Sequence, residues 1–267
     1  TAYVRRTGDT HTGVAFIIVD AEGENVIVVA AGANETLSTA DVDAAREVIA
    51  GADVMLVQLE VPVATVSHAL RLAHEAGVVT VLNPAPGQTL DAELLGSVDV
   101  LTPNETELQL ITGQSVTGLA EAETAARGLL DVGVGTAVVT LGANGALIVS
   151  RDGARHVPGR RVAVVDTTGA GDAFNGALAV GLAEGRAMGD AVAFANAAAA
   201  LQVTKVGTAP AMPYVNEPAG PWLPLWTRVA PVVAGPTVGH VSGADGAGSG
   251  LHGPGLCPAE RGPGSLA

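Results

Sequence analysis

The stretch DTTGAGDAFNG, residues 166–176, places three glycines and two aspartates where a predicted strand meets a predicted helix. The strand is RVAVVD, residues 161–166, and the helix runs from about Ala170 to Glu184. Glycines let several backbone N–H groups point at one spot, and a helix N-terminus adds a positive dipole end, so the stretch predicts an anion site. Asp172 would compete with a bound anion, so its expected task is to accept a proton. An ordinary helix cap is the alternative.

Strands and helices alternate on the N-terminal side of this stretch. Short apolar runs predict strands at residues 53–60, 78–83, 98–102 and 136–142. Helical patterns lie between them, and one of these begins at Pro62 and continues to about Ala76. Such alternation predicts a parallel sheet that is covered by helices on both faces.

The regions on either side extend this pattern. Residues 145–166 predict short antiparallel strands around an Asp-Gly turn, and a helix is predicted from about Met188 to Val203. The pattern of residues 12–34 predicts a β-hairpin with strands at 14–19 and 26–30. Ser38, with Asp41 three residues later, predicts an N-cap and therefore the start of a helix. After about Glu217 the chain is rich in Gly, Pro, Ala and Val and has no sustained helical or strand period, which predicts a disordered or loosely attached tail. A shifted reading frame would give the same composition.

Composition and charge exclude several classes of function. Lys and Arg total 13 against 27 Asp and Glu, and the formal charge of -14 argues against a nucleic-acid partner. The single cysteine, Cys257, provides neither a disulfide framework nor a Cys-based metal site, so a cytoplasmic location is expected. No apolar run reaches the roughly 18 residues that a membrane-spanning helix needs.

Several separated motifs resemble the ribokinase/PfkB family of carbohydrate kinases. Beside DTTGAGDAFNG, the segments QLE, NPAP, TPNETE, VTLGANG and FANAAAALQVTKVGTAP occur in the family's order between about Thr12 and Glu217. The resemblance implies a three-layer α/β/α sandwich with a mainly parallel central sheet and a small β-hairpin lid. It also implies ATP-dependent transfer of a phosphoryl group to the 5-hydroxyl of D-ribose, with Mg²⁺ and K⁺ as cofactors.

The resemblance assigns roles to individual residues. Asp172 is implied as the catalytic base, and the backbone of Gly169, Ala170 and Gly171 as the anion hole. Asn104 and Glu107 are implied to order magnesium-bound phosphates through water, for which a helix cap with solvated acids is the alternative. The residues implied to line the nucleotide are Thr140, Leu141, Gly142, Ala143, Asn144, Gly145, Gly171 and Asn196.

Sugar and potassium sites are implied in the same way. Glu60, at the end of a predicted strand, is implied to contact the sugar, as is Asp172, and a solvated acid at a strand end is the alternative for Glu60. The implied K⁺ ligands are Asp166 and the backbone carbonyls of Thr168, Gln202, Lys205 and Gly207. One hydroxyl ligand expected by the resemblance falls at Ala211, where this chain has none.

The resemblance also implies that the family's N-terminal region is absent, so that the fold is N-terminally truncated. That region carries a Gly-Gly-Lys-type signature, and the pair Gly-Gly occurs nowhere in this chain. We therefore expect a partial β lid at 1–34, the α/β domain with the ATP site at 35–217, and a disordered or non-homologous tail at 218–267. The lid would mediate a homodimer if it is complete.

Three interpretations of function stay open at this point. The first is a ribose kinase, with activity far below that of an intact homologue because the sugar pocket is incomplete. The second is a catalytically inactive remnant that binds nucleotide or another subunit. The third is another sugar or nucleoside kinase of the same family.

Overall fold

The computed structural model describes residues 2–19 and 25–214, and all of them belong to one compact unit. The predicted tail at 218–267, with Cys257, lies outside the described residues. Within the described part of the chain, no helix has both the length and the apolar character needed to cross a membrane.

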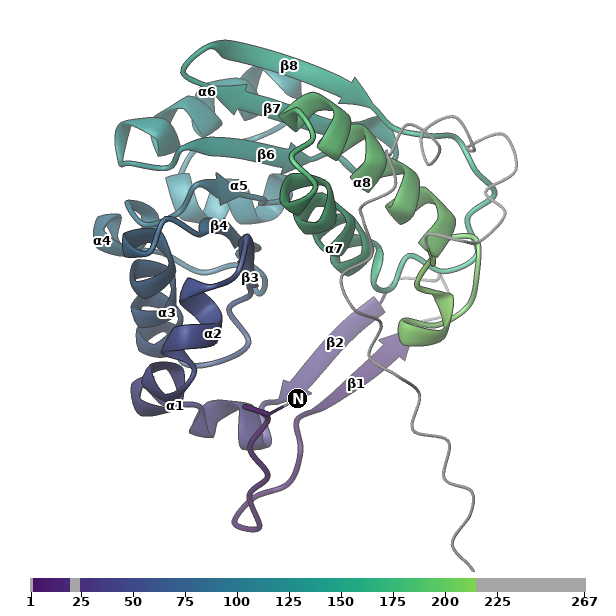
Figure 1. Cartoon of the computed structure of the whole chain (residues 1–267). Coiled ribbons are helices and arrows are strands. Elements are labelled where there is room, and N and C mark those ends of the chain that lie inside the picture. The colour runs from purple at the N-terminus through teal and green to yellow at the C-terminus, as the bar shows by residue number, and fades with distance from the viewer. Residues whose placement is uncertain (1, 20–24, 215–267) are drawn as a thin grey trace, which may run out of the picture. The chain divides into compact units, whose positions relative to one another are not determined.

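A six-stranded sheet organises the chain, with the strand order β3-β4-β5-β6-β7-β8 (Figure 1). Its strands are β3 (Val54–Val57), β4 (Val79–Leu82), β5 (Val100–Leu101), β6 (Thr136–Thr140), β7 (Gly145–Ser150) and β8 (Gly153–Pro158). The strands from β3 to β6 are parallel, while β7 and β8 are antiparallel to their neighbours. The predicted, mainly parallel sheet is confirmed.

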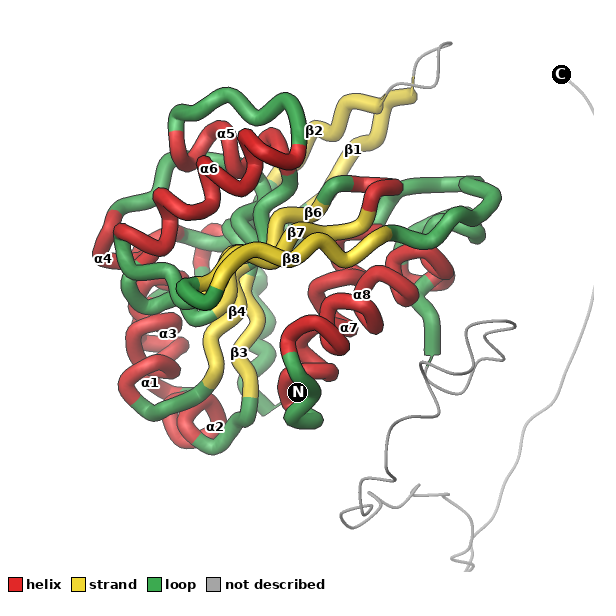
Figure 2. The backbone as a smooth tube through the Cα atoms, turned by 90° about the horizontal axis from the view of Figure 1, so that it is seen from above, coloured by secondary structure: helices red, strands yellow, loops and turns green. Residues whose placement is uncertain are grey.

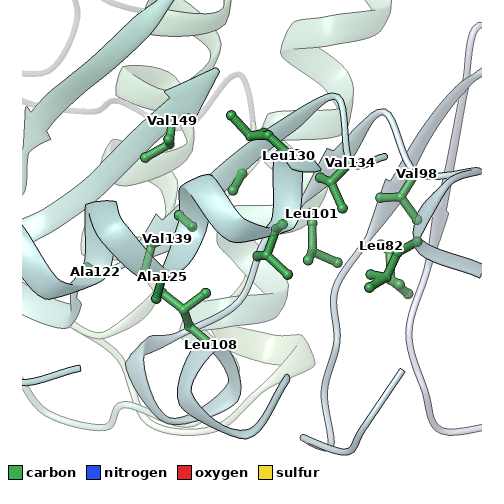
Figure 3. Packing of buried hydrophobic residues seen from close by; sticks show 14 of the residues in the cluster. Leu82, Val98, Leu101, Leu108, Ala122, Ala125, Leu130, Val134, Val139 and Val149 are labelled. Atoms are coloured by element: carbon green, nitrogen blue, oxygen red, sulfur yellow. The ribbon is translucent and has the colours of Figure 1, made fainter. Parts of the chain in front are cut away.

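Helices lie on both faces of this sheet (Figure 2). They are α1 (Thr39–Ala44), α2 (Arg46–Ala50), α3 (Val63–Glu75), α4 (Ala92–Leu95), α5 (Glu105–Thr112), α6 (Leu119–Asp131), α7 (Ala170–Ala183) and α8 (Met188–Gln202). Alternate strand residues point to opposite faces, as the period of two requires. Leu82, Leu101 and Val139 join the core under α3 to α6, shown in Figure 3, whereas their chain neighbours Val81 and Val100 pack with α7 and α8.

The N-terminal segment forms a separate two-stranded sheet. Strands β1 (Val14–Val19) and β2 (Asn25–Ala30) pair antiparallel, with Val14 opposite Ala30, which confirms the predicted hairpin. A short 3₁₀ helix η1 (Gly32–Thr36) follows. Ser38 then caps α1, because its side chain accepts from Asp41 N–H while the Asp41 carboxylate accepts from Ser38 N–H.

Three sequence predictions need correction. Residues 161–166 form no strand: the N–H groups of Val165 and Asp166 both donate to Val203 O at the end of α8, and no described strand pairs beside them. The predicted strand 53–60 ends at Val57, because Leu59 N–H turns to Ala85 O instead of continuing the ladder. The helix after Ser38 is broken at Ala45, which leaves α1 and α2 as separate short helices.

Candidate active site

The N-terminal turn of α7 is tied to the carboxyl end of β5 through Asn175. Thr102, directly after β5, donates its hydroxyl to Asn175 Oδ1 at 2.6 Å, and Asn175 Nδ2 donates to Gly171 O at 2.9 Å. Both Thr102 and Asn175 are buried. Ligands of open parallel sheets bind outside the carboxyl ends of the strands, so this link holds the glycine-rich turn where a ligand is expected.

Asp172 lies in the first turn of α7 and is exposed to solvent. Gly169 is the N-cap, in the left-handed region with φ of 81°, and no side chain caps the helix. Ala170 N–H donates to Thr167 O at 3.2 Å, and of the three predicted anion-hole residues Gly171 is the exposed one. The first N–H groups of a helix have no acceptor within the helix, so the first turn of α7 is suited to bind an anion. Such an anion would lie next to the Asp172 carboxylate.

Asn104 and Glu107 form a capping box at the start of α5. Glu107 N–H donates to Asn104 Oδ1 and Asn104 N–H donates to Glu107 Oε2, both at 2.8 Å. Burial raises the pKa of the Glu107 carboxyl, and the hydrogen bond from Asn104 partly opposes this rise. A backbone bridge between Asn104 and Thr140 brings this helix start next to the end of β6. The helix cap that was the alternative for Asn104 and Glu107 is therefore present. It uses Glu107 Oε2 and not Glu107 Oε1.

The predicted nucleotide segment 140–145 forms a tight turn between β6 and β7. Residues 142–144 form the 3₁₀ helix η2, and the side chain of Leu141 is buried in the core. Leu141 N–H donates to Gly145 O at 2.8 Å, and Leu141 O accepts from Asn144 N–H at 3.0 Å, so the backbone of Leu141 is used within the turn. Gly145 has φ of 91°, and a Cβ there would collide with the backbone of β8 at Val157. Asn144 O accepts from Gly159 N–H at 3.1 Å and from the His156 ring at 2.8 Å, which fixes the turn.

The two remaining predicted contact residues are Asn196 and Glu60. Asn196 is buried in α8, and its Nδ2 donates to Val157 O at 3.1 Å, so the amide joins α8 to β8. Glu60 is exposed in the segment that follows β3, three residues beyond the strand end. The roles of Asn196 toward adenine and of Glu60 toward a sugar stay predictions.

An apolar groove of about 180 Å³ extends from Asp172 along α7 and α8. Ala173, Val180, Phe194 and Met212 are among the residues that line it. Each hydroxyl of a polyol that leaves water needs a hydrogen-bond partner in the protein. This groove offers almost no such partner apart from the Asp172 carboxylate. The groove is therefore poorly suited to a sugar.

Asp166 joins two segments near the start of α7. Its Oδ1 accepts from Thr168 N–H and its Oδ2 from Gly207 N–H, each at 2.9 Å. The Thr168 side chain and backbone, together with Gly207 N–H, hold the pKa of Asp166 below its usual value. Beside it, Gln202 Nε2 donates to Thr168 O at 3.1 Å and to Gly207 O at 2.9 Å.

Comparison with known proteins identifies the family of this chain. The profile of the pfkB family carbohydrate kinases matches residues 1–214. The chain belongs to the pfkB family. Ribokinase of Staphylococcus aureus strain COL is 39% identical over 218 residues, which cover 81% of this chain and 72% of that protein. Deoxyribokinase of Salmonella typhi is 39% identical over 218 residues, covering 81% of this chain and 71% of that protein.

A solved structure supports the same assignment. The structure of Arabidopsis thaliana ribokinase complexed with ribose and ATP matches with a TM-score of 0.73 and 31% identity. It covers 82% of this chain and 70% of that chain. Membership of the pfkB family confirms the predicted class of enzyme, a carbohydrate kinase, and the predicted α/β fold.

The potassium site that the resemblance implied does not fit the geometry around Gln202. Two of its expected ligands, Thr168 O and Gly207 O, already accept from Gln202 Nε2, and Gln202 O accepts from Lys205 N–H at 3.2 Å. The hydroxyl expected at position 211 is replaced by the buried methyl group of Ala211. The groups around Gln202 therefore do not fit K⁺ as a cofactor of this chain.

Sequence reasoning missed Asn175 and Thr102, which set the position of the pfkB motif DTTGAGDAFNG. Asn175 belongs to that motif, and a polar amide among the apolar residues of a helix was the available signal. Its partner Thr102 lies 73 residues away in the sequence, so the link itself required the structure.

Proposed function

We propose that this chain is an ATP-dependent sugar kinase that transfers the γ-phosphoryl group to the 5-hydroxyl of D-ribose. The observation that carries the proposal is the exposed Asp172 on the uncapped first turn of α7, held at the carboxyl end of β5 by Asn175. Family membership supports phosphoryl transfer to a sugar, and the Arabidopsis thaliana relative, whose structure holds ribose and ATP, supports the choice of substrates.

In the proposed reaction, Asp172 accepts the proton of the attacking sugar hydroxyl. The hydroxyl oxygen bonds to the γ-phosphorus as the bond from that phosphorus to the β–γ bridging oxygen breaks, and ADP leaves with the electron pair. The exposed backbone of Gly171 and the N-terminal end of the α7 dipole offset the charge of the transferred group. The exposed position of Asp172 supports this role because a base must reach the proton that it removes.

Magnesium fits this site as an ion carried by the nucleotide. Among residues 2–19 and 25–214, no group of three or more His, Cys, Asp or Glu side chains that could hold a metal ion is found. Mg²⁺ keeps several waters when it binds through phosphates, and Asn104 and Glu107 would orient those waters. The ion would neutralise charge on the phosphates during transfer.

We infer that the turn at 140–145 holds the nucleotide, with Asn196 on the adenine side. The bridge between Asn104 and Thr140 supports this inference, because it joins the two segments proposed to meet the phosphates and the ribose. The α/β domain with the ATP site would then correspond to residues 35–217, with the partial lid at 1–34.

We propose that turnover by this chain is slow. Among the described residues, only Glu60 and Asp172 are assigned to the sugar, and the groove next to Asp172 is apolar. A positioned base accelerates only a substrate that is itself held in line. Turnover equal to that of Staphylococcus aureus ribokinase would contradict this proposal.

The hairpin is the proposed dimer surface. Val14, Phe16, Val28 and Val29 are exposed apolar residues on β1 and β2, with Phe16 opposite Val28. Exposed apolar patches of this kind often mark contacts between proteins. Phe16→Glu is expected to convert a homodimer into a monomer in light scattering after size-exclusion chromatography, and a wild-type monomer would contradict the proposal.

The substrate is tested by measuring ADP release with D-ribose, 2-deoxy-D-ribose, D-fructose and adenosine, with identification of the phosphorylated product. We expect release to be fastest with D-ribose. Faster release with 2-deoxy-D-ribose would favour the activity named for the Salmonella typhi relative, which is equally identical to this chain. Binding of ATP without release for any acceptor would favour the inactive remnant.

A further inference from the structure

Three backbone carbonyl oxygens converge on the side chain of Gln202 at the end of α8. Nε2 of Gln202 lies 3.1 Å from Thr168 O, 2.9 Å from Gly207 O and 3.3 Å from Thr208 O. The residue is fully buried. Its Oε1 is the one buried side-chain oxygen or nitrogen of the described residues that has no hydrogen-bond partner.

This arrangement requires positive charge or a donor at the position of Nε2. Three carbonyl oxygens that face one point repel one another unless a donor or a cation lies between them. The amide nitrogen has two N–H groups, so it satisfies two of the carbonyls fully and the third in part. An apolar residue would avoid the cost of the unpartnered Oε1. That cost is tolerated here because the amide nitrogen stabilises the carbonyl cluster.

A monovalent cation and the Gln202 amide exclude each other from this position. Clusters of carbonyl oxygens are the ligands that replace the hydration shell of K⁺, whereas Mg²⁺ prefers carboxylates and water. The carboxylate of Asp166, bonded to Thr168 N–H and Gly207 N–H, adds negative charge beside the same carbonyls. The surroundings therefore suit a cation, but the amide nitrogen already lies within 2.9–3.3 Å of the oxygens.

The amide also supports the turn that precedes Asp172. Gly169 has φ of 81°, and a Cβ at this position would lie 3.2 Å from Gln202 Nε2. We propose that the Gln202 amide replaces a monovalent cation in this chain and joins the turn at 167–169 to the loop at 205–208. The chain then needs no K⁺ for stability, and removal of the amide opens a site for a cation of the size of K⁺.

The test compares cation binding by wild type, Gln202→Ala and Gln202→Met. Thermal unfolding is followed in about 100 mM choline chloride, NaCl or KCl, and ²⁰⁵Tl⁺ is titrated by NMR as a direct probe of a K⁺ site. Neither readout depends on catalysis, so the outcome is independent of the proposed sugar kinase activity. Gln114→Ala, at an exposed glutamine between α5 and α6, is the matched control.

For wild type we expect a Tm that differs by less than about 1 °C between the three salts, and no saturable Tl⁺ signal. Gln202→Ala is expected to lose stability in choline chloride and to regain about 5 °C or more in KCl, with saturable Tl⁺ binding. Gln202→Met fills the space without a donor, so it is expected to be less stable than wild type in every salt.

Three results would overturn the proposal. The first is a K⁺-specific rise in Tm or saturable Tl⁺ binding for wild type, because the amide would then leave room for the cation. The second is a folded Gln202→Ala that shows no response to K⁺. The third is a Gln202→Met protein as stable as wild type, because the side chain would then act through its volume alone. This third result decides the question even if Gln202→Ala does not fold.

Discussion

Removal of the Asn175 side chain should destabilise the fold by about 3 kcal/mol. Asn175→Ala eliminates the hydrogen bond from Thr102 at 2.6 Å and the one to Gly171 O at 2.9 Å, each worth about 1 kcal/mol. The Thr102 hydroxyl keeps only the Leu82 carbonyl at 3.3 Å as an acceptor, and a small cavity remains. These two effects add about 1 kcal/mol. In a chain of this size, the total corresponds to a decrease in Tm of roughly 6–12 °C.

Urea unfolding followed by circular dichroism measures this loss. Gln114→Ala removes an exposed amide and is expected to change the free energy of unfolding by less than about 0.5 kcal/mol. Thr102→Val and the double variant complete a double-mutant cycle, for which we expect a coupling of about 1 kcal/mol. A loss for Asn175→Ala as small as that for Gln114→Ala, or a coupling near zero, would refute the idea that Asn175 joins α7 to β5.

Further predictions concern a glycine and two carboxylates. Gly145→Ala should cost more than about 2 kcal/mol in urea unfolding, because φ is 91° and a Cβ would meet Val157 O, whereas Gly176→Ala, in open space on α7, should be neutral or stabilising. Burial raises the pKa of Glu107, so the folded state favours the protonated carboxyl. The stabilisation from this group is present below about pH 4.5, and it is lost as the pH rises through the raised pKa of the folded state. Glu107→Gln should therefore gain stability over wild type between about pH 4.5 and pH 7, and a constant difference would contradict this. The pKa of Asp166 is lowered, so Asp166→Asn should be destabilised at neutral pH, with a difference that shrinks as the pH falls below 3.8.

Local signals in the sequence were sufficient where a feature depends on neighbouring residues. The spacing of Ser38 and Asp41 predicts the observed capping box, since both hydrogen bonds lie within one turn. The glycines before Asp172 predict the start of α7, and Gly169 adopts the left-handed conformation that glycine favours. The alternation of apolar runs predicts the parallel strands, because each strand must bury both of its faces.

Features that depend on distant residues could not be predicted in this way. Residues 161–166 have the composition of a strand, yet a strand also requires a partner, and none of the described strands pairs with them. Gln202 is a single amide at the end of an alanine-rich helix, and the acceptors of its side chain come from Thr168, 34 residues away in the sequence, and from the loop at 205–208. The resemblance implied K⁺ ligands at the carbonyls of Thr168 and Gly207 but gave no indication that Gln202 Nε2 donates to both of them.

The measurement that tests the central claim most directly is ribose-dependent ADP release by Asp172→Asn beside Asp190→Asn. Asp190 is the matched control, because it is the third residue of α8 as Asp172 is of α7, and both are exposed. We expect Asp172→Asn to reduce kcat by a factor of about 10² to 10⁴ with little change in ATP affinity, while Asp190→Asn retains wild-type release. Equal ribose-dependent release by the two variants would contradict the assignment of Asp172 as the base.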